Sequence, residues 1–316
     1  MNKFFLLMIS LCLACAYPVS EDGATNGILD ALQDLDTLPK VLAVDNDLDI
    51  NNAGGHLQGI QTIDHATGRY AILSGSSSTY AYFVTVELGE ENRVLHLHEI
   101  LQSPFKHAGG FQIAENFMAI GIEDNEARDQ SYVYVYDLSS LPSIPQVPVA
   151  MIKREGIRER ATAGCVAITF VGDRCLIIVG DWDTLHLDFY LAKKTRDTFT
   201  DFKLAHSITV ASVSRDNWTD EEWLPYQNIN LYQENGQLFL LGLTSNTEKI
   251  NVIDIYLLET KEMKDFQLKK IGRKLFTNQG GDFISAGGIE IVDGEINGVL
   301  SSSRSMENNF RIYYYH

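Results

Sequence analysis

The sequence predicts an all-β fold, a single β-propeller of five four-stranded blades, because one strand pattern recurs five times with turn signals between its strands. In each repeat a small or polar residue opens a short strand, a turn leads to a second apolar strand, and a polar loop precedes a third strand rich in Tyr, Val and Ile. The five openings are Gly59–Gln61, Gly110–Gln112, Gly164–Val166, Asn228–Asn230 and Gly288–Glu290. Units of this length are typical of propeller blades.

Turn chemistry and strand composition support each repeat in order. Pairs such as Asn235-Gly236 and Asp293-Gly294 between apolar runs are strong hairpin signals, and they precede second strands. Enrichment in β-branched and aromatic residues favours strands over helices for the third elements. The predicted second strands are residues 70–73, 117–122, 175–179, 238–243 and 296–300, and the third strands are 81–88, 132–136, 185–191, 250–257 and 310–315.

A fourth strand precedes the next opening in four repeats, at residues 94–100, 147–152, 202–208 and 266–271. The last repeat lacks one, whereas the strand-like run 39–44 has no blade of its own. We expect these two to pair, because the pairing closes the ring and leaves no long exposed sheet edge. A β-sandwich or two small β domains are disfavoured, since the polar stretches recur within each repeat and none marks a single boundary.

The first residues have the layout of a cleavable secretory signal: Lys3, an apolar run over residues 4–14, and small residues around Cys15. We therefore expect residues 1–16 to be removed and the protein to be secreted, into the extracellular space or a periplasm. A lipoprotein modified at Cys15 is less favoured, because Cys12 occupies a place where such signals usually have an aliphatic residue.

The rest of the chain divides into residues 17–37, a partly irregular segment that forms at most one helical turn, and residues 38–316, the propeller domain. No further segment is long and apolar enough to predict a transmembrane helix. Only Cys165 and Cys175 remain outside the signal, and pairing about the Gly172-Asp173 turn would set Cys165 opposite Gly180. We therefore expect two buried thiols. We also expect the protein to be a monomer.

The formal net charge of −17 disfavours nucleic acid and anionic membrane surfaces as partners, because a field of this sign repels phosphate groups. Cations, neutral glycans and extracellular proteins remain open as partners. The simplest explanation of the charge is solubility outside the cell.

Two stretches resemble the blades of secreted bacterial repeat propellers of the WD40/YVTN-like kind. They are Gly110–Ile113 followed by Tyr134–Leu138, and Gly180–Asp183 with Leu187–Tyr190. The resemblance covers residues 38–316. It implies the propeller architecture and leaves the activity open, since this fold carries many functions.

First strands line the central channel of a propeller, so the residues two places after each opening share similar surroundings. Four of the five are polar: Gln61, Gln112, Asn230 and Glu290, with Val166 as the exception. They could surround a cation such as calcium, but hydration of space that side chains cannot fill is the simpler explanation.

His56 and His107 stand three residues before their openings, at equivalent places in two blades. Two imidazoles on one face could share a metal or transfer protons. The plainer alternative is that each imidazole bonds the backbone of its own Gly-rich turn.

The loops after the second strands carry most of the acid, and the candidate catalytic residues there are Glu123, Asp124, Asp181 and Asp183. Paired carboxylates can catalyse glycoside hydrolysis, and aromatic side chains can stack on a sugar. The candidate aromatic contacts are Trp182, Trp218 and Trp223. Solvated acidic loops are the default alternative in so acidic a chain.

The favoured functional interpretation is an exported, non-enzymatic binding propeller that recognises a glycan or protein on its loop face. The alternative is a five-bladed glycoside hydrolase or polysaccharide lyase that uses the loop carboxylates. Nucleophile-elbow, zinc-protease and phosphate-loop motifs are absent from the sequence.

Overall fold

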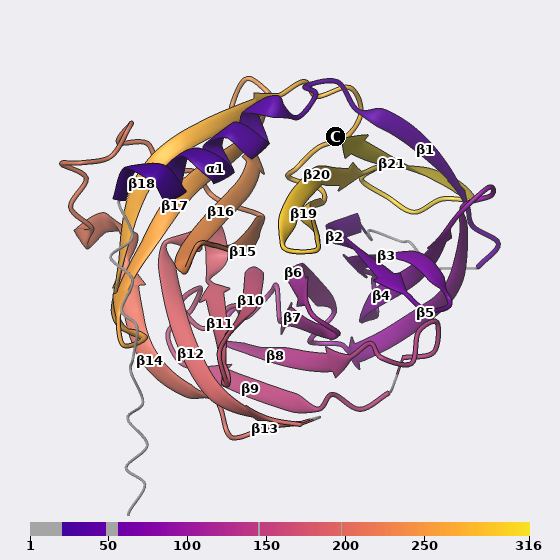
Figure 1. The fold of residues 1–316 in the computed structure, drawn as a ribbon. Helices are drawn as coiled ribbons and strands as arrows, with labels where there is room; N and C mark the ends of the chain where they lie inside the picture. Colours follow the sequence, from indigo (N-terminus) through magenta and orange to yellow (C-terminus); the bar gives the residue numbers. More distant parts are fainter. Residues whose placement is uncertain (1–20, 49–55, 145, 197) are drawn as a thin grey trace, which may run out of the picture.

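The computed structural model describes residues 21–48, 56–144, 146–196 and 198–316, with side chains from residue 27 onward. The predicted signal peptide lies outside these residues. The strands are grouped in five blades around a central axis, as predicted (Figure 1). In the described part of the chain, no helix is both long and apolar enough to span a membrane.

Each blade is an antiparallel sheet whose first strand lies nearest the axis. Blade one contains β2 (His56–His65), β3 (Gly68–Ser76), β4 (Tyr80–Leu88) and β5 (Arg93–Gln102); blade two contains β6 (His107–Ala114), β7 (Phe117–Glu123), β8 (Gln130–Asp137) and β9 (Ala150–Glu155). Blade three contains β10 (Cys165–Val171), β11 (Arg174–Gly180), β12 (His186–Thr195) and β14 (Lys203–Thr209), with the short β13 (Thr198–Phe199) beside β12. Blade four contains β15 (Asn228–Glu234), β16 (Gln237–Ser245), β17 (Asn251–Lys261) and β18 (Lys264–Phe276).

Blade five combines the two ends of the described chain, which confirms the predicted closure. Its strands are β19 (Gly287–Val292), β20 (Glu295–Ser302), β21 (Asn309–Tyr315) and β1 (Lys40–Asp45). β1 pairs antiparallel with β21 over six residues, from Lys40 opposite Tyr314 to Asp45 opposite Asn309. The outer edge of β21 is thereby covered.

Five apolar clusters fill the spaces between neighbouring blades. Phe83 of blade one meets Tyr136 of blade two at a ring separation of 5.5 Å, and Phe189 of blade three stacks on Phe266 of blade four at 4.4 Å. Aromatic pairs in these geometries add to the free energy gained by burying apolar area. The core is therefore a ring of interfaces between blades.

Steric constraints explain why glycine occurs at the start of several inner strands. A Cβ on Gly110 would lie 2.4 Å from the carbonyl oxygen of Gln227, and one on Gly288 would lie 1.8 Å from that of Ile60. The first strands converge on one axis, so at these two positions a neighbouring backbone lies too close for a side chain.

The segment before the propeller is more regular than predicted. Helix α1 covers Glu21–Asp34, where at most one turn was expected. It packs on blades four and five (Figure 1) through Ile28 and Leu32, which are buried, together with Leu35 just after the helix, among residues of β16, β17, β20 and β21. The ammonium of Lys274 donates to the carbonyl oxygens of Gln33 and Leu35, and a cation at a helix C-terminus is favourable. Tertiary packing thus stabilises a helix whose sequence alone predicts little.

The two cysteines of the propeller are free, buried thiols, as predicted. Cys165 lies opposite Gly180 in the β10–β11 hairpin, and Cys175 lies opposite Phe170. Burial raises the pKa of both thiols, so they remain protonated and unreactive.

Candidate active site

A pocket of about 160 Å³ lies at one mouth of the channel, and we call it the entry pocket. In an antiparallel hairpin the start of the first strand and the end of the second lie together, so residues from several blades meet on this face. Six of the predicted site residues line it: His56, His107, Glu123, Asp181, Trp182 and Asp183. Gln58, Asn125, Gly164, Tyr226 and Gln227 complete the lining.

Glu123, the last residue of β7, is fully buried. Its Oε2 accepts a hydrogen bond from the backbone N–H of Ala163 at 2.9 Å. Its Oε1 lies 3.2 Å from Nδ1 of His107, within ion-pair distance, but neither atom has a hydrogen bond of good geometry. An unbonded carboxylate oxygen and an unbonded imidazole nitrogen therefore lie side by side, buried, at the pocket.

Asp181 follows β11 and is 3% exposed. Its Oδ1 accepts a hydrogen bond from the backbone N–H of His186 at 2.8 Å, and its Oδ2 lies 2.6 Å from Nδ1 of the His186 ring. Burial raises the pKa of Asp181, and the bonds from His186 only partly oppose it. A carboxyl group of this kind retains its proton to higher pH than a solvated aspartate.

The two residues after Asp181 shape the rim of the entry pocket. The backbone N–H of Trp182 donates to Oγ1 of Thr162 at 2.7 Å, and the Arg128 guanidinium covers one face of the Trp182 ring at 3.7 Å. Asp183 is exposed and has φ = +58°. Its carboxylate makes no hydrogen bond or ion pair with any residue that the structure describes.

The two predicted histidines are neighbours. The rings of His56 and His107 are 5.9 Å apart and nearly perpendicular, and Gln58 contacts the His56 ring. Burial and the adjacent His107 lower the pKa of His56, which favours its neutral form. Within the described ranges, no three His, Cys, Asp or Glu side chains are placed to hold a metal ion together.

Three further candidates lie outside the entry pocket. Asp124 turns to its own loop, where its Oδ1 accepts the N–H groups of residues 126 and 127 at 2.8 and 3.1 Å. Trp218 and Trp223 pack against Tyr256, and the Trp218 indole donates to the carbonyl oxygen of Leu268 at 3.1 Å. The two tryptophans thus fasten the insertion before β15 to blade four.

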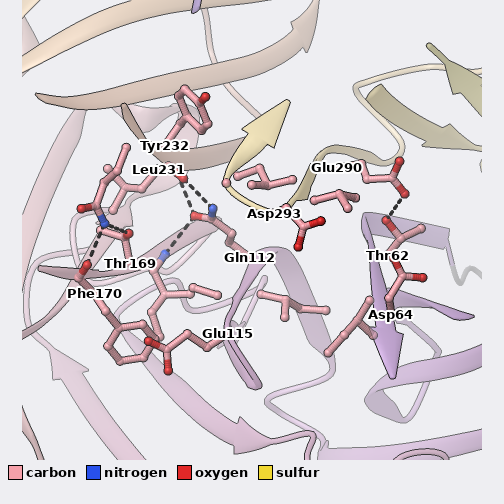
Figure 2. A pocket seen from close by; sticks show the side chains of 18 residues that line it. Thr62, Asp64, Gln112, Glu115, Thr169, Phe170, Leu231, Tyr232, Glu290 and Asp293 are labelled. Atoms are coloured by element: carbon pink, nitrogen blue, oxygen red, sulfur yellow. Dashed lines mark hydrogen bonds between the residues drawn. The ribbon is translucent and has the colours of Figure 1, made fainter. Parts of the chain in front are cut away.

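The predicted channel residues bind neighbouring strands. The Gln112 amide donates to the carbonyl oxygen of Leu231 at 2.7 Å and accepts the N–H groups of Leu231 and Ile168 at 2.8 and 3.1 Å (Figure 2). Asn230 accepts the N–H of Ile289 at 2.9 Å, and Gln61 lies against both of these residues. These amides replace the backbone partners that the divergent inner strands cannot supply to one another.

Glu290 lies beside a cavity of about 490 Å³ at the opposite mouth of the channel (Figure 2). Its carboxylate accepts hydrogen bonds from Thr62 at 2.6 Å and Asn297 at 2.7 Å, and it also contacts Arg69 and Tyr314. Burial alone raises the pKa of Glu290, but these hydrogen bonds outweigh it and lower the pKa. Its acceptor positions are therefore already used.

The site also depends on residues that sequence reasoning missed. His186 binds Asp181, Thr162 holds the backbone of Trp182, and Arg128 covers the Trp182 ring. His186 lies five residues after Asp181, across a tight turn at the start of β12, so proximity along the chain was the only available signal.

Comparisons with known proteins identify related structures but no sequence family. No family model matches the chain, and no curated protein matches its sequence. Among solved structures, a GH62 hydrolase in complex with xylotriose matches with a TM-score of 0.50 and 10% identity, over 89% of this chain and 98% of that one. The α-L-arabinofuranosidase of Podospora anserina in complex with cellotriose matches with a TM-score of 0.48 and 9% identity, over 88% and 98%.

A bifunctional GH43-CE protein of Bacteroides eggerthii is also similar, with a TM-score of 0.45 and 11% identity. The match covers 82% of this chain but only 32% of that protein. The likeness to the GH62 hydrolase shows a shared five-bladed fold. The propeller architecture implied by the resemblance to repeat propellers is confirmed, whereas no repeat-family model matches.

These comparisons contradict the prediction that the protein is a non-enzymatic binding propeller. The solved structure that shares the five-bladed arrangement at a TM-score of 0.50 is that of a GH62 hydrolase in complex with xylotriose. Repeat composition could not reveal this, because it reports the architecture and carries no signal for the chemistry of the loops. The alternative interpretation, a propeller glycoside hydrolase, is the better supported of the two.

Proposed function

We propose that the protein is a glycoside hydrolase whose reaction centre is the entry pocket. The observation that carries the proposal is the convergence of two buried carboxyl groups, Glu123 and Asp181, on this pocket from neighbouring blades. Glycoside hydrolysis uses one carboxyl group as acid and a second as base or nucleophile. The GH62 hydrolase of similar fold supports the same reaction class.

Asp181 suits the role of general acid. A proton donor must hold its proton near the working pH, and the raised pKa of Asp181 meets this requirement. The bonds from His186 orient the group, which lines the entry pocket where a glycosidic oxygen would bind. Protonation of that oxygen lets the bond to the anomeric carbon break without formation of an alkoxide.

Glu123 suits the second role. Its Oε2 is fixed by Ala163, while its Oε1 accepts no hydrogen bond and so keeps its lone pairs for a water molecule or the anomeric carbon. His107, 3.2 Å away, stabilises the negative charge on this oxygen when its imidazole is protonated. The predicted secretion signal fits a polysaccharide substrate outside the cell.

The test is release of reducing sugar from a panel of plant and microbial polysaccharides by the purified mature protein. Asp181→Asn and Glu123→Gln should each lower kcat/KM by about 100-fold or more, since general acid–base groups contribute factors of this size. Asp124→Asn is the matched control, because an asparagine oxygen can still accept the two N–H groups of the Asp124 turn. Equal turnover by all four proteins, or no release from any substrate, would contradict the proposal.

A further inference from the structure

The loop after β11 contains two consecutive residues in the left-handed region: Asp183 with φ = +58° and Thr184 with φ = +52°. Such angles are uncommon for residues other than glycine, and a β-branched threonine there is an outlier. Glycine would relieve most of the strain at the first position, because it has no Cβ. The sequence instead places an aspartate there, at the rim of the entry pocket.

The surroundings hold this conformation firmly. The N–H of Thr184 donates to the carbonyl oxygen of Asp181 at 2.9 Å, and its buried hydroxyl accepts the backbone N–H of Tyr226, from the next blade, at 3.0 Å. At the start of the loop, Thr162 accepts the N–H of Trp182. Strain persists only when neighbouring contacts over-determine it, and such residues cluster at functional sites.

The carboxylate that this loop presents has no partner in the described structure. The nearby guanidinium of Arg128 covers Trp182 and donates to Glu159 at 3.2 Å. Asp183 therefore contributes a carboxylate without a counter-charge to the pocket that Asp181 and Glu123 also line. The pocket also contains the buried Glu123 Oε1 and His107 Nδ1, neither of which has a hydrogen bond, so it has polar atoms that a bound molecule or water can satisfy.

We propose that Asp183 is a substrate-binding residue, whose carboxylate accepts hydrogen bonds from two adjacent hydroxyl groups of the glycosyl unit in the entry pocket. This inference rests on the proposed hydrolase function and identifies a specificity determinant for it. Two carboxylate oxygens match the spacing of a vicinal diol, and hydrogen bonds to a charged acceptor are stronger than neutral ones. A unit that is deoxygenated or acylated at one of these hydroxyls should bind more weakly.

Stability measurements test the strain without reference to activity. Asp183→Gly should raise the urea midpoint, and Asp183→Asn should leave it nearly unchanged, because asparagine tolerates positive φ. Asp293→Gly is the matched control: Asp293 has φ = +51° at the opposite mouth, so the same gain is expected with no change in turnover. An unchanged or lower midpoint for Asp183→Gly would overturn the argument from strain.

Kinetics and binding test the role in recognition. Asp183→Asn and Asp183→Gly should raise KM by about tenfold or more, with a smaller change in kcat, and the effect should shrink for a substrate lacking one of the two hydroxyls. A fall in kcat at constant KM would overturn the binding role.

Retention of soluble oligosaccharides by Asp181→Asn and by the Asp181→Asn/Asp183→Asn double variant gives a readout that needs no hydrolysis. Weaker retention by the double variant is expected; equal retention, or none by either protein, refutes the role of Asp183. Failure of the hydrolase proposal would show separately, as turnover that survives Asp181→Asn.

Discussion

Asp188→Asn should destabilise the protein at neutral pH and remove part of its sensitivity to acid. Asp188 lies on β12 with a side chain only 4% exposed. Its Oδ2 accepts hydrogen bonds from Arg154 at 2.6 Å and Arg160 at 2.7 Å, and its Oδ1 accepts one from Ser207 at 2.6 Å. Arg154 belongs to β9 of the preceding blade, so the ion pair joins blades two and three.

The size of the effect follows from the pKa of this carboxyl. Burial by itself raises the pKa of Asp188, but the bonds from Arg160 and the charge of Arg154 outweigh it and lower the pKa from 3.8 to about 2. A tenfold change in proton affinity corresponds to about 1.4 kcal/mol, so the ionised group contributes about 2 kcal/mol to the free energy of unfolding. Because the pKa is lowered on folding, this contribution is complete above pH 3.8 and disappears as the pH falls through about 2. Asp188→Asn also leaves the buried guanidinium of Arg154 without its counter-charge, and the total loss at pH 7 should be about 3 kcal/mol.

The assay is urea unfolding followed by tryptophan fluorescence, for wild type and Asp188→Asn, at several pH values between 7 and 2. The difference in unfolding free energy between the two proteins should be constant from pH 7 to about pH 5 and should narrow by about 2 kcal/mol toward pH 2. Other carboxyl groups titrate in both proteins and cancel in the difference. A gap that stays constant down to pH 2, or no gap at pH 7, would refute the assignment of the lowered pKa to this ion pair.

Two further predictions concern the ring. Gly110→Ala should cost about 3 kcal/mol in urea unfolding, because its Cβ would lie 2.4 Å from a backbone oxygen, whereas Gly89→Ala, with no atom within 4 Å, should be nearly neutral. A chain that begins after residue 46 lacks β1 and should self-associate through the uncovered edge of β21 in size-exclusion chromatography. A chain that begins at residue 37 keeps β1 and is the control; monomeric behaviour of both would show that β1 is dispensable.

Much of the architecture could be predicted, because it depends on short-range signals that recur. Turn pairs such as Asn235-Gly236 fix hairpins locally, and their repetition specifies blades. The pairing of β1 with β21 could be predicted because the first strand had no blade of its own and the last repeat lacked a fourth strand. Helix α1 could not be predicted in the same way, since Ile28, Leu32 and Leu35 favour a helix only when blades four and five offer an apolar surface.

The sequence could predict which loops form the site, but it could not predict which contacts each side chain in those loops makes. Asp181 and Glu123 could be singled out because they lie at the ends of second strands, which end on the same face of every blade. Asp124 has the same sequence context as Glu123, yet its side chain turns back to its own loop. Trp218 and Trp223 were predicted to contact a sugar, but they pack on Tyr256 of blade four. Their burial depends on tertiary contacts that the residues adjacent in sequence do not encode.

The pairing of β1 with β21 also bears on how the chain folds during synthesis. β1 is made before the four complete blades and its partner after them, so the ring cannot close until both have emerged. Contacts between segments so distant along the chain form slowly, because a long loop must be ordered first. Until then β1 keeps unpaired backbone groups along the edge that later pairs with β21, and these groups are a template for association with other chains. A newly made molecule is therefore most vulnerable to aggregation in the interval before its last strand arrives.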